Sequence, residues 1–173
     1  MKNSEEETTD PADLVDSLKE DWHRERPELD LAAMGIVGRL VMLGEILKKR
    51  ANEVLTPYGL GYTDLDTLAT LRRSGPPYEL RPSVLLKTVL IQSGSLTACL
   101  KRLEKNGLVE RVLIPEDHRG RAVRLTERGR ELIDRAIEAR FDDAEASVAS
   151  LDAGERRTLE ELLRRVLLAN REP

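Results

Sequence analysis

Basic side chains are concentrated in one segment of a chain that is acidic overall. The 173-residue sequence has a net charge of −4, whereas residues 99–130 hold nine lysines or arginines against five acidic residues, a net charge of +4. A localised positive surface in an acidic protein suits contact with phosphate groups, as in a nucleic acid. The alternative is a solvated helix face whose charges pair with one another. Charge alone leaves both interpretations open.

The most specific chemistry in this segment lies at residues 117–121, Asp-His-Arg-Gly-Arg. Arg119 and Arg121 flank Gly120, so the sequence predicts a turn that presents two guanidinium groups. Such a group at the tip of a turn suits insertion into the minor groove of double-stranded DNA. Asp117 is placed to hold an arginine in register through a bidentate ion pair, which would stabilise the turn.

Residues 93–105 form a second candidate DNA-contacting element. Leu96, Leu100 and Leu103 recur at helical spacing and predict a buried face, with polar side chains on the opposite side. Short hydroxyl groups and long cations suit contacts with phosphates and base edges. The candidate DNA contacts of this helix are Ser93, Ser95, Thr97, Lys101 and Arg102. An ordinary amphipathic helix with a polar surface is the alternative.

The sequence gives little support to catalysis. His23 and His118 lie in unrelated segments with no metal-ligand spacing around them. Residues 59–61, Gly-Leu-Gly, lack the third glycine and the preceding strand of a nucleotide-binding loop. We therefore expect neither enzyme activity nor catalytic residues, and neither a metal nor a cofactor.

The composition also bears on the cellular compartment. The single cysteine excludes an intramolecular disulfide and is typical of a reducing environment. No apolar run approaches the roughly 20 residues that a membrane span needs, and the N-terminus is acidic rather than signal-like. We expect a cytoplasmic protein with no membrane partner.

Helices are the main elements that position these residues. Residues 1–9 hold no apolar side chain besides Met1 and are expected to be disordered. One helix is predicted to start at Asp10 and Pro11, and a second is capped by Asp30. A short helix follows from Thr63, with Asp66 completing a capping box. Further helices are predicted over 82–89 and 93–105, strands over 108–113 and 122–125 around a charged turn at 116–121, and final helices capped by Thr126 and Asp152.

Three compact helices followed by a β-hairpin predict a winged helix-turn-helix, a mainly α fold with a small β-hairpin wing. We divide the chain into N-terminal helices (10–56), a DNA-binding lobe (57–126, with the contacts in 82–126) and C-terminal helices (127–173). The end helices carry apolar stripes that need a partner, which predicts dimerisation through both ends. A two-fold homodimer suits a palindromic operator in double-stranded DNA.

The sequence resembles the MarR family of transcription regulators. The family's motif, Asp-x-Arg, a short strand and Leu-Thr-x-x-Gly, is present as Asp117, Arg119, Leu125, Thr126 and Gly129. Residues 81–83, 102–105 and 107–109 are also similar to the family pattern, and the resemblance covers about residues 31–168. It implies a homodimer, an arginine of the wing in the minor groove, and release of DNA when a ligand binds.

A narrower resemblance connects the added N-terminal helix to the urate-responsive subfamily. It implies a ligand site made by Trp22, Asp66, Arg73 and Arg111. An indole can stack on a planar ligand, and arginine offers charge and a fork of donors to an anion. Cys99 departs from the subfamily, which has an arginine at this position. Two expectations follow: a urate pocket whose coupling to DNA is altered, or a ligand that is a different anion, such as a polycarboxylate.

Simpler interpretations remain for the same residues. Trp22 can serve only as a buried anchor of its helix, Asp66 as a helix cap, and Arg73 and Arg111 as surface charges. Cys99 is interpreted as a small buried hydrophobe or as the sensor of a redox-responsive regulator. The sequence favours a repressor that an anion releases from DNA. The other alternative is a helical protein-interaction module without specific DNA binding.

Overall fold

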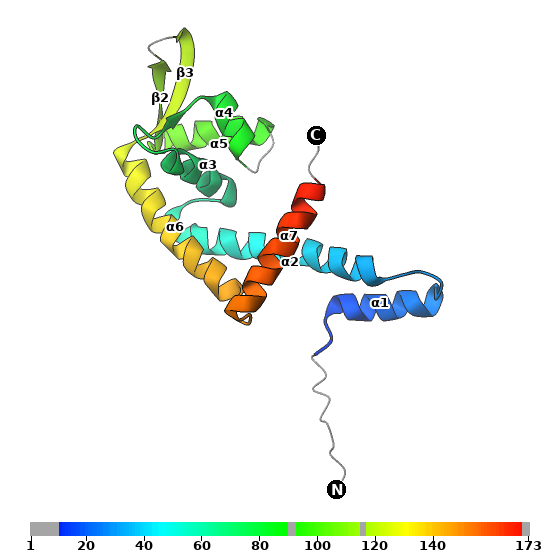
Figure 1. Cartoon of the computed structure of the whole chain (residues 1–173). Helices are drawn as coiled ribbons and strands as arrows, with labels where there is room; N and C mark the ends of the chain where they lie inside the picture. The colour runs from blue at the N-terminus through cyan, green and yellow to red at the C-terminus, as the bar shows by residue number, and fades with distance from the viewer. Residues whose placement is uncertain (1–10, 90–92, 115–116, 171–173) are drawn as a thin grey trace. The chain divides into compact units, whose positions relative to one another are not determined.

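The structure, a computed structural model, describes residues 11–89, 93–114 and 117–170 (Figure 1). The tail predicted to be disordered, residues 1–9, lies outside this range. The helices are α1 (Leu14–Glu25), α2 (Ala32–Leu55), the 3-10 turn η1 (Thr56–Tyr58), α3 (Tyr62–Arg73), α4 (Pro82–Thr88), α5 (Ser93–Lys105), α6 (Glu127–Ser147) and α7 (Ala153–Ala169), and the strands are β1 (Glu79–Leu80), β2 (Val109–Ile114) and β3 (Asp117–Leu125). The fold is therefore mainly α with a small antiparallel sheet, as predicted.

Capping side chains set the helix starts, and two of the predicted starts are wrong. α1 begins after Asp13 rather than at Asp10 and Pro11, because the Asp13 carboxylate accepts from the amides of Val15 and Asp16. The cap of α3 is Gly61, two positions before the predicted Thr63. The predicted caps at Thr126 and Asp152 are confirmed, since each side chain accepts backbone amides of the helix that follows it.

The contacts divide the chain into two compact units, residues 1–47 and 48–173. In the N-terminal unit, α1 packs on the first part of α2, with Val15 buried against Gly38. Arg39 on α2 donates to Asp13 at 2.8 Å and to Asp16 at 2.7 Å. The hydrogen bond from Arg39 holds the pKa of Asp16 below its ordinary value. An arginine of α2 therefore fixes the start of α1.

α3 lies at the centre of the C-terminal unit, where it packs against α4, α5, α6 and β3. Its leucines occupy a core to which the end of α2, the wing, α4, α5 and α6 also contribute. The largest fully buried apolar side chains of this core are Leu55, Leu68, Leu71, Leu85, Leu103, Val123 and Ile133. Burial of each such side chain contributes roughly 1.5–3 kcal/mol, so α3 is the support on which the neighbouring helices are held.

The sheet has the order β1-β3-β2 and is antiparallel throughout. The predicted hairpin is confirmed, and β1 is a third strand that the sequence did not reveal. The predicted charged turn at 116–121 is wrong for residues 117–121, because β3 already begins at Asp117. A register shift falls between Leu113 and Ile114, so the hairpin is irregular near its far end.

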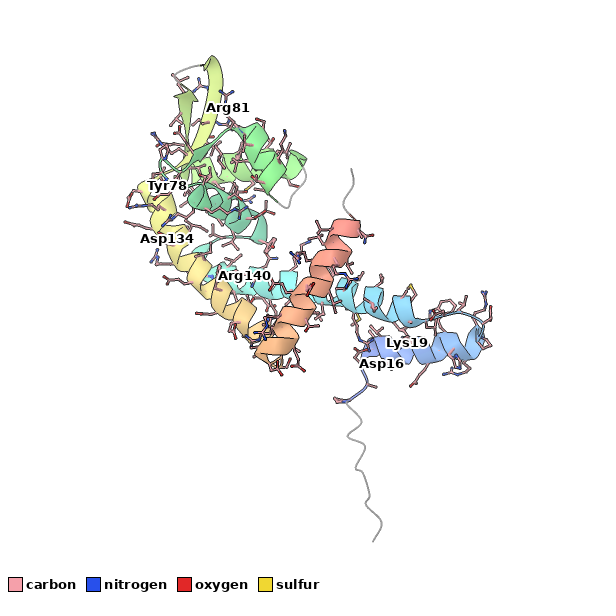
Figure 2. The ribbon with its side chains drawn as sticks, in the orientation of Figure 1. Asp16, Lys19, Tyr78, Arg81, Asp134 and Arg140 are labelled. Atoms are coloured by element: carbon pink, nitrogen blue, oxygen red, sulfur yellow. The ribbon has the colours of Figure 1, made fainter. Side chains whose placement is uncertain are left out.

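An ion pair connects α3 with α6, and its acidic partner, Asp134, is labelled in Figure 2 together with Tyr78, whose ring lies beside the cation. Arg72 Nε donates to Asp134 Oδ1 at 2.7 Å, and the guanidinium carbon lies 5.0 Å from the centre of the Tyr78 ring. A cation over the face of a ring is attracted to it by the ring's quadrupole. The end of α3 is thus held on α6 by polar contacts as well as by the apolar core.

Candidate nucleic-acid interface

α5 separates its apolar and polar side chains as the sequence predicts. Leu96, Leu100 and Leu103 are buried against the core. The predicted contacts Ser95, Thr97 and Lys101 are exposed. Ser93 begins the helix, but its side chain lies outside the part that the structure describes. The exposed face of α5 carries hydroxyl groups and a cation where DNA can approach.

The wing extends beyond the helices of the unit (Figure 1). Arg121 is exposed on β3, where its backbone pairs with that of Leu113, itself 64% exposed. The side chains of Asp117 and Arg119 lie outside the described part, so their expected pairing and groove contact stay predictions. Arg121 presents a guanidinium group from a strand rather than from a tight turn.

Arg102, predicted to contact DNA, is bound to a carboxylate of its own chain. Its Nη2 lies 2.5 Å from Asp64 Oδ1. The Asp64 side chain is only 5% exposed and that of Arg102 is 50% exposed, so the pair joins a buried anion to a half-exposed cation. The hydrogen bond to Asp64 raises the pKa of Arg102 above its ordinary value.

The same carboxylate makes two further contacts. Cys99 Sγ donates to Asp64 Oδ1 at 3.2 Å, and Asp64 Oδ2 accepts from the amide of Gly61 at 3.0 Å. Gly61 and Asp64 therefore form the N-terminal cap of α3, and the predicted capping box of Thr63 and Asp66 is wrong. We refer to Asp64, Cys99 and Arg102 as the Asp64 cluster; it connects the start of α3 to α5.

Sequence reasoning selected Asp66 on α3 and missed Asp64. Asp64 lies four and seven positions before Leu68 and Leu71, so all three fall on the buried face of the helix. A carboxylate on a buried face requires a partner. The position of Asp64 on the buried face therefore predicts a cation on a neighbouring helix.

Cys99 is buried and protonated. Thr67 Oγ1 lies 3.4 Å from its sulfur, and Asp64 accepts a hydrogen bond from the thiol. Burial is the largest cause that raises the pKa of the Cys99 thiol, to about 11. Because the thiolate is the reactive form, this environment disfavours the redox-sensor alternative.

Ion pairs stiffen the base of the wing. Arg111 on β2 lies 3.3 Å from Glu104 on α5, and Arg124 on β3 lies 2.9 Å from Glu110 on β2. The first pair connects the end of α5 to the wing. It also directs Arg111, a predicted ligand contact, toward α5.

A cavity of about 280 Å³ lies between α3 and α6. Two of the four predicted ligand residues, Asp66 and Arg73, line it. Arg73 also donates to the carbonyl of Thr88 on α4 at 3.3 Å. Arg140 on α6 adds a second cation (Figure 2). The remaining lining residues are Tyr62, Leu65, Ala69, Ile137, Phe141 and Ala144, and Arg111 is not among them.

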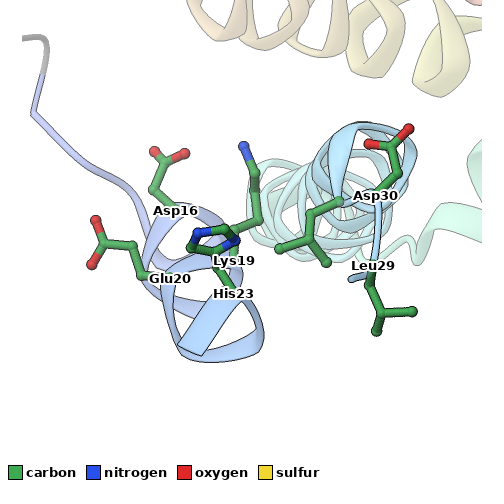
Figure 3. Close-up of a pocket in the computed structure, with 7 residues that line it drawn as sticks. Asp16, Lys19, Glu20, His23, Leu29 and Asp30 are labelled. Atoms are coloured by element: carbon green, nitrogen blue, oxygen red, sulfur yellow. The ribbon is translucent and has the colours of Figure 1, made fainter. Parts of the chain in front are cut away.

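Trp22 lines a different cavity, within the N-terminal unit. Its indole is 54% exposed beside a groove of about 530 Å³, and Lys19 is the one charged residue in the lining. A neighbouring hollow of about 400 Å³ presents the polar side of α1 (Figure 3). There Asp16, Glu20 and Asp30 outnumber Lys19 and His23, which disfavours an anion.

Neither a metal site nor a membrane helix is found among the residues that the structure describes. No group of three or more His, Cys, Asp or Glu side chains in that part is arranged to hold a metal ion. No helix in it is long and apolar enough to cross a bilayer.

Comparison with known proteins identifies the family. A family model described as MarR family matches residues 58–120, from the end of η1 into β3. The HTH-type transcriptional regulator PecS of Dickeya dadantii is 33% identical over 152 residues, which cover 88% of this chain and 92% of PecS. The chain belongs to the MarR family of transcription regulators.

Two solved MarR-family structures contain DNA. A regulator from Streptomyces coelicolor in complex with DNA has a TM-score of 0.74 and 25% identity, with 83% of this chain and 94% of that chain covered. A cysteine-to-serine mutant of E. coli MarR with operator DNA has a TM-score of 0.68 and 28% identity, with 90% and 99% covered. The chain is thus a winged-helix DNA-binding regulator and not an enzyme.

The structure explains part of the MarR-family motif in physical terms. Leu125 ends β3 and is buried in the core. Thr126 then caps α6 by accepting from the amide of Gly129 at 3.0 Å. The threonine hydroxyl also donates to the carbonyl of Gly107, the residue that ends α5 with a φ of 67°. One threonine therefore joins the end of α5, the wing and α6.

Proposed function

We propose that this MarR-family protein is a homodimeric repressor that acts in the cytoplasm, binds a palindromic operator and is released by a small anionic ligand. The observation that carries the DNA-binding part is the exposed polar face of α5, beside an exposed wing arginine. Buried leucines hold the opposite face of α5, so the helix is a rigid support for these contacts. The proposed DNA contacts are Ser93, Ser95, Thr97, Lys101, Arg119 and Arg121, with Asp117 as a support for the wing and Arg102 considered separately below.

Exposed apolar side chains support the homodimer. On α7, Leu159, Leu162, Leu163 and Val166 are 40–48% exposed, and on α2 Met34, Val37 and Val41 are 49–63% exposed. Faces of this kind favour a partner because water contact with them is unfavourable. A second copy of the chain is the proposed partner, and its two-fold symmetry would match a palindromic operator.

The cavity between α3 and α6 supports an anionic ligand such as urate or a polycarboxylate. Arg73 and Arg140 supply positive charge, and Tyr62 and Phe141 supply ring faces for a planar molecule. Asp66 on the same wall can accept a hydrogen bond from a ligand that carries N–H or O–H groups. Trp22 and Arg111 enter this proposal from the sequence resemblance alone.

DNA binding is tested with the full chain and two fluorescently labelled duplexes of equal length. One contains the DNA upstream of the protein's own gene, and the other is unrelated. We expect the wild-type protein to bind the upstream duplex more tightly than the unrelated one. Lys101→Ala and Arg121→Ala should each lower the affinity for DNA and reduce the slope of log affinity against log salt by about one. Lys49→Ala on α2, whose side chain is 80% exposed, is the control and should change neither. Equally weak binding to both duplexes across salt concentrations would favour the protein-interaction alternative.

The ligand and the sign of regulation require separate experiments. Titration calorimetry with urate and with citrate should show binding that Arg73→Ala weakens and Arg128→Ala, a surface cation outside this cavity, leaves unchanged. The ligand that binds should also lower DNA affinity in the anisotropy assay. A reporter gene behind the upstream DNA should be less active when the protein is present, and higher reporter activity would identify an activator instead.

A further inference from the structure

Arg102 is tied to the interior of its own protein, although it lies on α5, the helix proposed to contact DNA. Its partner Asp64 is a buried carboxylate, and the ion pair measures 2.5 Å. Removing the cation from such a pair leaves a buried charge uncompensated, which is strongly unfavourable. Movement of Arg102 to a DNA phosphate would impose this cost. By contrast, the neighbouring Lys101 has no ion pair in the described part of the chain and is free to face DNA.

The Asp64 cluster fixes α5 in ways that the apolar core does not. The buried leucines determine which face of α5 meets the core, but hydrophobic contacts are non-directional and fix the exact rotation of the helix less strictly. Hydrogen bonds are directional and restrict both movements. Cys99 and Arg102, one turn apart on α5, both donate to Asp64 Oδ1. Asp64 Oδ2 accepts from the Gly61 amide, which ties the carboxylate to the start of α3.

We propose that Arg102 is a positioning residue that acts through Asp64 and does not contact DNA. The pair fixes the rotation of α5 on α3, and this rotation determines where Thr97 and Lys101 meet base edges and phosphates. Sequence specificity therefore depends on a buried carboxylate that never touches the nucleic acid. The inference rests on the proposed function, because it assigns a role in operator recognition to residues behind the DNA-binding face.

The test compares Arg102→Ala, Asp64→Asn and the double variant in the full chain. The probes are a duplex enriched by the wild-type protein from a random pool and an unrelated duplex of equal length. We expect each single variant to bind the enriched duplex about tenfold more weakly, the size of effect for one charge-assisted hydrogen bond. The double variant should be no weaker than the singles, because both substitutions remove one interaction. Affinity for the unrelated duplex should stay within about twofold, with the salt slope unchanged.

A direct DNA contact predicts a different pattern and would overturn the proposal. If Arg102 binds a phosphate, Arg102→Ala weakens both duplexes and lowers the salt slope by about one. If it reads a base, Arg102→Ala weakens the enriched duplex alone. In either case Asp64→Asn would not reproduce the loss, and the double variant would follow Arg102→Ala. Lys101→Ala supplies the reference pattern for a phosphate contact.

Two controls separate positioning from loss of folding and from failure of the proposed function. Thermal unfolding identifies the temperatures at which each variant is folded, and Arg102→Lys, which keeps the charge and one donor, should recover part of the specific affinity. If the wild-type protein enriches no duplex, the proposed function fails. Amide hydrogen exchange of residues 95–105 in the free protein then decides the positioning role. Faster exchange to the same extent in both single variants supports it, and unchanged exchange overturns it.

Discussion

Gly129, in the first turn of α6, lies so close to Leu108 that a Cβ built on it would be 2.0 Å from the Leu108 carbonyl oxygen. That carbonyl accepts from the amide of Thr126 at 3.1 Å, which fixes its position. The atom in conflict belongs to the backbone, so a side-chain rotation cannot relieve the contact. Gly129 lies where three segments meet: the end of α5, the start of the wing and the start of α6. Only the hydrogen of a glycine fits there.

Gly129→Ala should therefore destabilise the protein by about 2–4 kcal/mol, because the added methyl group must move backbone. Urea unfolding followed by circular dichroism measures this as a lower midpoint. Gly44→Ala is the control: a Cβ at Gly44, in the middle of α2, would meet no atom of the described residues within 4 Å outside its own stretch of helix. There the loss of a helix glycine should stabilise by about 0.5–1 kcal/mol. A Gly129→Ala midpoint equal to that of wild type would contradict the described packing.

A buried carboxylate also connects α2 to α6, and its loss should be measurable. Asp143 is 6% exposed and lies 2.8 Å from Arg50 and 3.2 Å from Arg140. Asp143→Asn removes the negative charge and leaves two guanidinium groups side by side, so we expect a loss of about 1–3 kcal/mol in thermal unfolding. Glu53→Gln is the matched control. Its pair with Lys49 is long, at 3.9 Å, and exposed, so its loss should cost less than about 0.5 kcal/mol.

The parts of the fold that depend on local pattern were predictable from the sequence. The spacing of Leu96, Leu100 and Leu103 predicted which face of α5 is buried, and Thr126 and Asp152 predicted the starts of the last two helices. In each case the decisive interactions lie within a few residues of one another. The winged helix-turn-helix followed because this order of local elements has few ways to pack.

The remaining features depend on contacts between residues far apart in the chain. Asp64 and Arg102 are separated by 38 positions, and no local rule pairs them. Likewise, β1 is a two-residue strand that exists only because β3 is available to pair with it. Arg111 was predicted to line the ligand site with Asp66, yet the structure pairs it with Glu104. Sequence spacing showed which side chains share a helix face but not which helix that face meets.

Cys99 should make stability fall at alkaline pH. The folded protein raises the pKa of its thiol to about 11 from an ordinary value of about 9. Because the folded state holds the thiol proton more tightly than the unfolded state, this proton stabilises the fold. Its full contribution is present below the pKa of the unfolded state and is lost as the pH rises through the pKa of the folded state. We expect this group to account for up to about 2–3 kcal/mol of lost stability between pH 9 and 11. Urea unfolding of wild type and Cys99→Ala across this range should show a steeper decline for wild type, and parallel curves would contradict the assignment.

The same thiol should be unreactive near neutral pH. It is buried, and at pH 7.5 it is protonated, so modification by a thiol reagent should be at least about 100-fold slower in the folded chain than in urea. Cys99 is the only cysteine, so the reaction reports on this site alone. Operator affinity should not change after mild peroxide treatment. Peroxide-induced release that Cys99→Ser abolishes would restore the redox alternative.

Dimerisation should depend on the exposed apolar face of α7. Leu163 and Val166 are 40% and 45% exposed in the single chain, and a second copy would bury them. Leu163→Glu places a charge in this contact, so we expect light scattering coupled to size-exclusion chromatography to show a monomer where wild type is a dimer. Operator affinity should fall about 100-fold or more, because two linked half-site contacts become one. Glu160→Gln on the same helix should remain dimeric, and a Leu163→Glu dimer with wild-type affinity would place the interface elsewhere.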